Sequence, residues 1–243
     1  MSLRIAFDLD GVLADMEAEL VRQAKLLFGE SVTAPVPPTA ELEAAADAPV
    51  EAGTEPIENT PAVLKLRMTA RQQRRLWKHV ESIEDFWETL DEIEPGAIAR
   101  LASLAADRRW EVVFLTKRPE GAGRTAQLQT QRWLAAKGFE LPSVFVVQGS
   151  RGRIAASLDL DIVVDDRPEN CLDVVVDSKA RAILVWRNEE KKLPVAARRL
   201  GIGVVRSVSE CLEILTQMDN DRRAPGMVDR VMRLFGLKQP THV

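Results

Sequence analysis

The sequence predicts an α/β protein with a Rossmann-like parallel sheet, helices on both faces, and a mainly helical insertion after the first strand. Short apolar runs of strand length alternate with longer segments of helical periodicity, which is typical of parallel strands joined by crossover helices. Most of these runs are apolar throughout, as expected for strands that are covered on both faces. The alternation is interrupted once, between about residues 30 and 94.

The apolar runs define the strands, and proline and glycine mark helix ends between them. Pro95 opens a helix with Ile98, Leu101 and Leu104 on its inward face, and Gly138 closes another that carries Leu128, Trp133 and Leu134. The predicted strands lie near Arg4 to Asp8, Glu111 to Thr116, Val144 to Gln148, Asp161 to Asp165, Ala182 to Trp186 and Gly203 to Arg206.

The interruption reads as a cap inserted into the sheet domain. Residues 31–62 are rich in proline and acidic residues and carry no basic residue, which favours a loop or a partly disordered excursion. A basic amphipathic helix is predicted from about Ala62 to Ile83. The predicted division is therefore a core of residues 1–14 and 92–218, a cap of residues 15–91, and a tail of residues 219–243 with a short amphipathic stretch.

Composition narrows the function classes. With 33 basic and 37 acidic residues the formal net charge is −4, so the chain lacks the positive field that binding to nucleic acid requires. Cys171 and Cys211 have neither CxxC spacing nor a neighbouring histidine, and we expect two buried thiols. No apolar stretch is long enough to span a membrane and no leader segment is recognisable, so a cytoplasmic protein is expected.

The first predicted strand ends in two aspartates. Asp8 and Asp10 are separated by one residue, so in extended chain they point to the same side, beyond the carboxyl edge of the sheet, where open α/β sheets bind ligands. Two carboxylates this close favour a hard divalent cation between them and a raised pKa on one. Gly11 allows a sharp turn. The structural alternative is that the aspartates cap the following helix.

A second acidic pair favours the functional reading. Asp165 and Asp166 end another buried strand, directly before a helix that Pro168 opens. Because the carboxyl ends of parallel strands share one edge, the two pairs of aspartates can converge. Four helix-capping aspartates would not be expected to gather in this way.

Two further segments offer groups for an anion. The strand that ends at Thr116 is followed by Lys117 and Arg118, and a hydroxyl with backbone N–H groups after it suits phosphate oxygens. Arg151 and Arg153 stand at the start of a predicted short helix, where a cation and free N–H groups would face an anion. An ordinary strand end and solvated arginines are the alternatives.

The order DxDGV, strand-Thr, basic residue, strand-DD resembles the four motifs of the haloacid dehalogenase superfamily in its phosphatase branch. The resemblance implies Asp8 as the nucleophile that forms an aspartyl-phosphate and Asp10 as general acid and base. It implies that Thr116 binds the phosphoryl group and that Mg²⁺ lies on Asp8, the Asp10 carbonyl, Asp165 and Asp166. Where the family has a lysine in the third motif, this chain offers Arg151 or Arg153, of which Arg151 suits the spacing better.

Within the superfamily, the segments DLDGVLADMEAEL, DFWETLDEIEPGA and DDRPEN are similar to those of cytosolic-type 5'(3')-deoxyribonucleotidases. That resemblance implies a small phosphorylated substrate, a nucleoside monophosphate, with Phe86 and Trp87 stacking on the base. Core packing is the alternative for these two rings. The Thr116–Lys117–Arg118 turn and the acidic excursion depart from the deoxyribonucleotidase pattern, and another small phosphate ester, such as a sugar phosphate, is the alternative substrate.

Other classes fit the sequence less well. A receiver-like phosphoacceptor module shares the aspartates, the threonine and the cation, but it is about half as long and has no cap. A dinucleotide-binding oxidoreductase requires a GxGxxG turn after the first strand, and the chain has none there.

Overall fold

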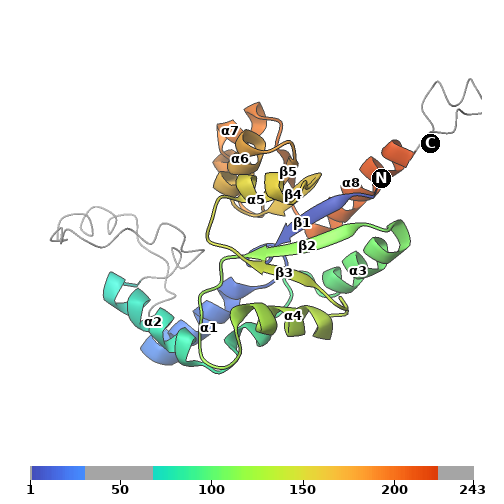
Figure 1. Cartoon of the computed structure of the whole chain (residues 1–243). Helices are drawn as coiled ribbons and strands as arrows, with labels where there is room; N and C mark the ends of the chain where they lie inside the picture. Colours follow the sequence, from blue (N-terminus) through green and yellow to red (C-terminus); the bar gives the residue numbers. More distant parts are fainter. Residues whose placement is uncertain (1, 31–67, 224–243) are drawn as a thin grey trace, which may run out of the picture.

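The computed structural model describes residues 2–30 and 68–223. Six parallel strands form one sheet in the order β3-β2-β1-β4-β5-β6 (Figure 1). The predicted fold class is confirmed. The strands are β1 (Arg4–Asp8), β2 (Glu111–Thr116), β3 (Ser143–Val146), β4 (Ile162–Asp165), β5 (Arg181–Val185) and β6 (Gly203–Val205).

The strand bounds agree closely with the sequence reading. β1 and β2 have the predicted ends, because each is paired along its whole length. β3 begins at Ser143 and ends at Val146, and β6 ends at Val205. Both are edge strands that pair on one side only, so fewer hydrogen bonds hold their ends in extended form.

Eight α-helices and two short 3₁₀ helices are seen in the described part of the chain. They are α1 (Met16–Phe28), α2 (Ala70–Ser82), η3 (Phe86–Glu88), α3 (Ala97–Arg108), α4 (Ala126–Ala136), α5 (Arg151–Ser157), α6 (Pro168–Asp177), η4 (Glu190–Lys192), α7 (Val195–Arg199) and α8 (Val208–Arg223). Among the described residues, no helix is both long enough and apolar enough to cross a membrane.

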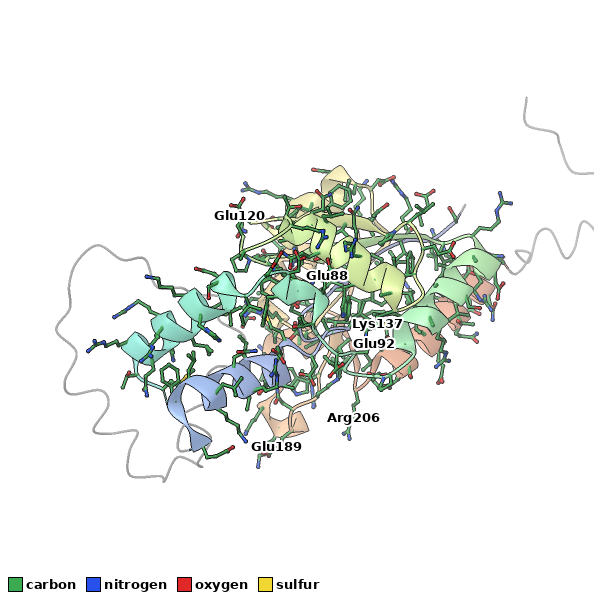
Figure 2. The ribbon with its side chains drawn as sticks, turned by 90° about the horizontal axis from the view of Figure 1, so that it is seen from below. Glu88, Glu92, Glu120, Lys137, Glu189 and Arg206 are labelled. Carbon is green, nitrogen blue, oxygen red and sulfur yellow. The ribbon has the colours of Figure 1, made fainter. Side chains whose placement is uncertain are left out.

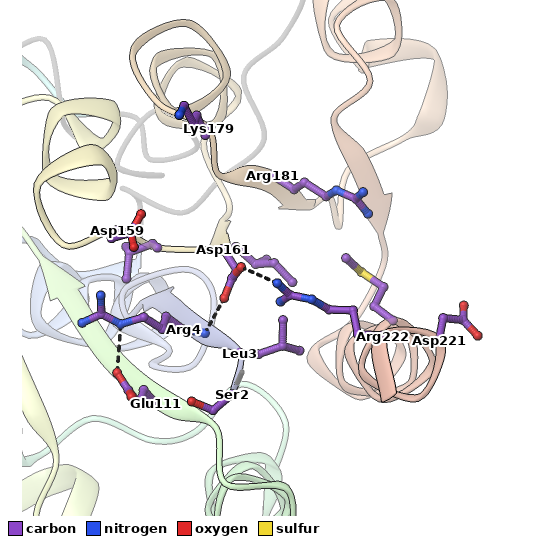
Figure 3. A pocket seen from close by; sticks show the side chains of 13 residues that line it. Ser2, Leu3, Arg4, Glu111, Asp159, Asp161, Lys179, Arg181, Asp221 and Arg222 are labelled. Carbon is purple, nitrogen blue, oxygen red and sulfur yellow. Dashed lines mark hydrogen bonds and ion pairs between the residues drawn. The ribbon is translucent and has the colours of Figure 1, made fainter. Parts of the chain in front are cut away.

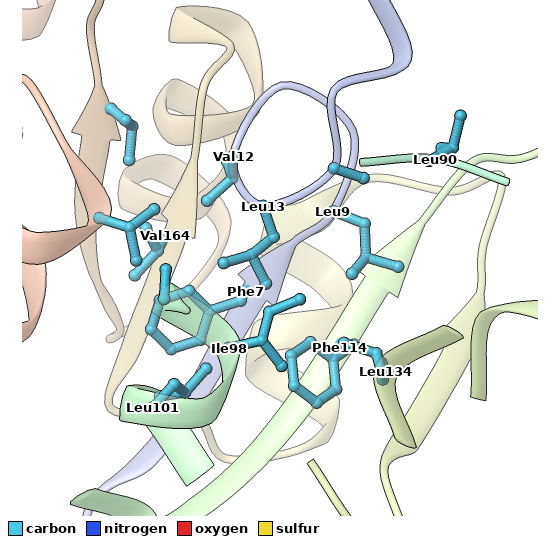
Figure 4. Packing of buried hydrophobic residues seen from close by; sticks show 14 of the residues in the cluster. Phe7, Leu9, Val12, Leu13, Leu90, Ile98, Leu101, Phe114, Leu134 and Val164 are labelled. Carbon is cyan, nitrogen blue, oxygen red and sulfur yellow. The ribbon is translucent and has the colours of Figure 1, made fainter. Parts of the chain in front are cut away.

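Alternating residues of β1 supply two hydrophobic cores. Ile5 and Phe7 face the larger core, which α1, α3, α4 and α8 complete, and Ala6 faces the smaller core under α5, α6 and α7. Figure 4 shows Phe7 packed near Phe114 and Ile98 of the larger core. The sheet is thus covered on both faces, which explains its uninterrupted apolar strands. The predicted burial of both cysteines is confirmed.

Most of the predicted inward positions are buried, with one exception. Ile98, Leu101, Trp133 and Leu134 lie in the core, but Leu128 is 44% exposed, which corrects the prediction for α4. Leu128 stands in the first turn of α4, where its backbone N–H donates to the N-cap Thr125, and the buried side of this turn is formed by Ala126, Gln129 and Thr130 instead.

The described part of the predicted insertion contains α1, α2 and η3. The helices α1 and α2 lie side by side (Figures 1 and 2). Helix α2 begins at Ala70 because Thr69 and Gln72 form a reciprocal capping box. Residues 62–67 of the predicted helix, the excursion of residues 31–62 and the amphipathic stretch after residue 223 lie outside the described residues.

The strand order indicates where this sheet would bind a ligand. From the central β1 the chain runs outward through β2 and β3, then returns to β4 on the other side of β1 and continues to β6. The direction reverses between β1 and β4, and their carboxyl ends form the usual ligand-binding position of an open α/β sheet.

Candidate active site

The carboxyl ends of β1 and β4 carry the two acidic pairs. Phe7 is paired in register with Val164, so Asp8 and Asp165 are the next residues along neighbouring strands. Asp8 is 7% exposed and Asp165 is fully buried. The sequence-based expectation that these strand tips meet is therefore fulfilled by the sheet register itself.

Arg151 lies against the Asp8 carboxylate. Its Nη2 donates to Asp8 Oδ1 at 2.5 Å, and its Nε lies 3.6 Å from Asp165 Oδ2. Arg151 is 2% exposed, and its Nε and Nη1 have no hydrogen-bond partner. Helix α5 delivers this side chain from its first residue, after an N-cap at Ser150. Of the two arginines that the sequence left open, only Arg151 reaches the acidic residues.

Burial raises the pKa of Asp8 well above its usual value, and the nearby carboxylate of Asp165 raises it further, while Arg151 opposes both effects. Burial and the charge of Asp165 likewise raise the pKa of Asp166 to about 7. Asp8 and Asp166 thus lie in an environment that disfavours several uncompensated negative charges, in which a carboxylate takes up a proton or binds a cation.

Asn170 and Gly11 fix the second acidic pair. The Asn170 side-chain amide donates to both oxygens of Asp165, at 3.0 and 2.9 Å, and the backbone N–H of Arg167 donates to Asp165 Oδ1 at 2.9 Å. Asp166 lies over Gly11: a Cβ atom added at Gly11 would stand 2.1 Å from Asp166 Oδ2. Gly11 has φ +94°, so glycine is needed there for both space and conformation.

Asp10 takes a different partner. Thr116 Oγ1 donates to Asp10 Oδ2 at 3.1 Å, and the buried guanidinium of Arg118 spans both carboxylate oxygens of Asp10. The sequence offered Arg118 only as one of two cations after β2 that could meet an anion, and its pairing with Asp10 was not predicted. The alternation of extended chain, which places positions 116 and 118 on the same side after β2, was the signal that could have indicated it.

Four predicted residues lie apart from the carboxylates. No hydrogen bond or ion pair joins Lys117 or Arg153 to the acidic cluster in the described structure: Lys117 is partly exposed, and Arg153 is exposed on α5. Phe86 and Trp87 are each 2% exposed and pack edge to face in the core. This is the packing alternative, and a base could stack on these rings only after their segment moved.

The donor set suits a hard cation in its chemistry. It consists of carboxylates, their mutual repulsion is incompletely balanced, and Asp166 Oδ1 is buried without a hydrogen-bond partner. Across residues 2–30 and 68–223, however, no three acidic, histidine or cysteine side chains are grouped closely enough to hold a metal. Arg151 accounts for this, because it lies between Asp8 and Asp165, so metal binding requires these side chains to adjust.

A separate cavity of about 730 Å³ lies at the opposite edge of the sheet, at the amino ends of β1, β4 and β5 (Figure 3). Two of its acidic side chains are paired with arginines of the same cavity: Asp161 accepts from Arg222 and from the Arg4 backbone, and Glu111 accepts from Arg4. The cavity is therefore remote from the Asp8 cluster and has no part in the candidate site.

No protein-family model and no curated protein sequence matches the chain. Solved structures do. A HAD family hydrolase from Deinococcus radiodurans R1, with bound phosphate and sodium, aligns with a TM-score of 0.52 at 16% identity, over 89% of this chain and 96% of that one. This chain has the fold of the haloacid dehalogenase-like hydrolases. A protein from Thermotoga maritima assigned as a beta-phosphoglucomutase aligns with a TM-score of 0.51 at 18% identity, over 88% of this chain and 99% of that one. At 16–18% identity, these structural matches show that the fold is shared and nothing more.

Proposed function

We propose that this chain is a magnesium-dependent phosphomonoester hydrolase that works through an aspartyl-phosphate on Asp8. The observation that carries the proposal is the environment of Asp8. A carboxylate at the centre of an acidic cluster touches a buried arginine whose Nε and Nη1 have no partner. Unpartnered guanidinium donors beside a carboxylate nucleophile suit the equatorial oxygens of a phosphoryl group.

The reaction has two balanced steps. A carboxylate oxygen of Asp8 forms a bond to phosphorus as the ester P–O bond breaks, and the leaving oxygen keeps the bonding electrons and takes a proton from Asp10. Water then attacks the phosphorus and gives a proton to Asp10, and the P–O bond to Asp8 breaks. Inorganic phosphate leaves and both aspartates are restored. Dividing hydrolysis in this way replaces one difficult displacement by two easier ones.

In this proposal Asp8, Asp165, Asp166 and the backbone carbonyl of Asp10 would hold the magnesium ion. When bound, it would supply charge neutralisation at the acidic edge and at the phosphoryl oxygens. The chain's own residues do the rest: Arg151 draws the phosphoryl group to Asp8, and Asn170 keeps Asp165 oriented.

The proposed substrate is a nucleoside monophosphate of the cytoplasm, which would make the enzyme a 5'-nucleotidase. The segment resemblance to deoxyribonucleotidases supports this choice. A sugar phosphate is the second candidate. It is favoured by the burial of Phe86 and Trp87, which leaves neither of these two rings exposed for a base, and by the fold likeness to the Thermotoga maritima protein.

The decisive experiment measures phosphate release from p-nitrophenyl phosphate with Mg²⁺. We expect turnover by the wild type, a loss of more than about 1000-fold in Asp8→Asn, and silence after EDTA treatment until Mg²⁺ is restored. Asp107→Asn, an exposed carboxylate on α3, is the matched control and should retain full activity. Equal activity in Asp8→Asn and wild type would refute the covalent mechanism, and a single stoichiometric phosphorylation without turnover would indicate a phosphoacceptor module.

A substrate screen separates the two candidates. Nucleoside monophosphates and sugar phosphates are compared by kcat/KM on the same preparation. Preference for a nucleotide over the sugar phosphate of the same charge would support the 5'-nucleotidase, and the reverse order would support the sugar phosphatase.

A further inference from the structure

Arg118 is a charged side chain enclosed in the protein. It is 2% exposed. Its Nε donates to the two carboxylate oxygens of Asp10 at 3.2 and 3.0 Å, and its Nη2 donates to Asp10 Oδ1 at 2.8 Å. Its Nη1 donates to Thr130 Oγ1 in α4 at 2.9 Å. All three guanidinium nitrogens have partners, so the plane of the group is fixed.

Two indole rings hold the same guanidinium. Arg118 Cζ lies 5.0 Å from the ring centroid of Trp87 and 5.8 Å from that of Trp133. Each ring is anchored by its own N–H: Trp87 donates to the Pro119 carbonyl at 3.2 Å and Trp133 donates to the Leu90 carbonyl at 2.7 Å. Cation–π contacts of this kind are strongest where water is excluded.

Through Arg118, these contacts hold the Asp10 side chain in a fixed position. Besides Arg118, only the Thr116 hydroxyl is seen to donate to the Asp10 carboxylate in the described structure. The position of Asp10 therefore depends on α4, through Thr130 and Trp133, and on η3, through Trp87. Asp8 is held separately, by Arg151. The two aspartates that the proposed reaction needs thus have one arginine each.

We propose that Arg118 is a positioning residue that sets Asp10 for proton transfer to and from the leaving oxygen. The inference rests on the proposed function. In this proposal Arg118 acts through Asp10 and not on the phosphoryl group, since the side chain is buried and each of its three nitrogens donates to Asp10 or Thr130. Its removal would free the Asp10 carboxylate to turn and would leave it without its charged partner, which reduces the rate of the step in which Asp10 acts.

The test uses two substrates that differ in their need for a proton. p-Nitrophenolate leaves readily as an anion, whereas a simple alkoxide requires protonation as it leaves. In Arg118→Met we expect kcat for an alkyl phosphate to fall at least about 10-fold more than kcat for p-nitrophenyl phosphate, with KM for both nearly unchanged. A purely structural loss would lower both rates by the same factor.

Three companion variants sharpen the result. Arg118→Lys keeps the charge but loses the paired donors. If Arg118→Met fails to fold, the same comparison of the alkyl phosphate with p-nitrophenyl phosphate is made in Arg118→Lys, and the same selective loss of kcat is expected. Arg132→Met removes another link between α4 and η3, the exposed ion pair with Glu88, without touching Asp10, and should leave the substrate ratio unchanged. In an Asp10→Asn background, Arg118→Met should lower kcat no further, because both changes remove the same function.

The possible outcomes distinguish the role of Arg118 from the proposed phosphatase function. A selective loss on the alkyl ester that disappears in the Asp10→Asn background supports the role of Arg118. Equal losses on both substrates, or additive losses in the double variant, would overturn it while leaving the phosphatase intact. Failure of the wild type to hydrolyse any phosphate ester would overturn the proposed function, and the role of Arg118 with it.

Discussion

Asp8, Asp10, Asp165 and Asp166 share the carboxyl edge of the sheet with two buried arginines, Arg118 and Arg151. Ion pairs removed from water gain little net stability, because desolvation offsets the attraction. Their arrangement is better explained by chemistry: each arginine holds one aspartate in place.

Gly11 offers a test of the packing at this edge. In Gly11→Ala the added Cβ would meet Asp166, and φ +94° strains any residue with a side chain. We expect a stability loss of about 1–2 kcal/mol together with a large loss of phosphatase activity. Gly96→Ala is the matched control: it has φ +83° but open space around it, so it should lose similar stability and keep its activity. Chemical denaturation and the phosphate-release assay measure both effects, and equal activity in the two variants would contradict this account of Gly11.

Sequence reasoning located the carboxylates and favoured Arg151, but it gave Arg118 no role at the site. Asp8 and Asp165 were predictable because strand alternation and a shared sheet edge determine where they point. The pairing of Asp10 with Arg118 depends on two tryptophans from distant segments, and no local pattern encodes that enclosure. The same limit applies to Phe86 and Trp87, because the sequence of an aromatic pair is the same whether the rings pack in a core or bind a ligand.

Among the elements, the loop after β1 is held by a link to α8. Glu94 accepts from the backbone N–H groups of Val208 and Ser209, in the first turn of α8, and from Arg187 at 3.0 Å. Arg187 also donates to the backbone carbonyls of Gly11 and Val12. Glu94 therefore connects the helix that ends the described chain to the loop that carries Asp10.

This link predicts a pH-dependent stability. Burial alone would raise the pKa of Glu94, but the hydrogen bonds from Val208, Ser209 and Arg187 outweigh it and lower the pKa below 4.5. The unfolded chain then takes up the proton first on acidification, so this stabilisation is present above about pH 4.5 and is lost as the pH falls through the lower, folded-state pKa.

Glu94→Gln should accordingly lower the free energy of unfolding by about 1–2 kcal/mol at pH 7, and the difference from wild type should shrink as the pH falls through the folded-state pKa of Glu94. Urea unfolding at several pH values measures it. The control is Glu213→Gln. Glu213 lies on α8 and forms an exposed ion pair with Arg100 of α3, so its replacement should change the free energy of unfolding little at any pH. A constant difference across the pH range would show that Glu94 acts through packing and not through its charge.

Strand ends were predictable at the element scale because their signals are local: β1 and β2 fall where apolar runs meet charged residues. The prediction of one helix running on from about Ala62 was wrong, because Met68 and Thr69 are not helical and the capping box at Thr69 begins α2 at Ala70. The relation of the insertion to the sheet was harder to foresee, because it depends on side-chain packing between segments that are far apart in the sequence.

The whole molecule is joined by that packing. Leu76 and Val80 of α2 belong to the same buried cluster as Phe7 of β1 and Leu101 of α3. Helices that share a continuous core with a sheet are expected to unfold together with it, whereas an independent cap would melt in a transition of its own.

Leu76→Ala tests this cooperativity. The side chain is fully buried in α2, so its truncation leaves a cavity and should lower the global free energy of unfolding by about 2–5 kcal/mol. Hydrogen exchange of β1 should accelerate along with that of α2, because both open through the same global transition. Leu26→Ala on α1 is the control, since Leu26 is 69% exposed and its loss should have little effect. Faster exchange confined to α2, with β1 unchanged, would mean that the insertion opens separately from the sheet, and that substrate access and fold stability can be altered independently.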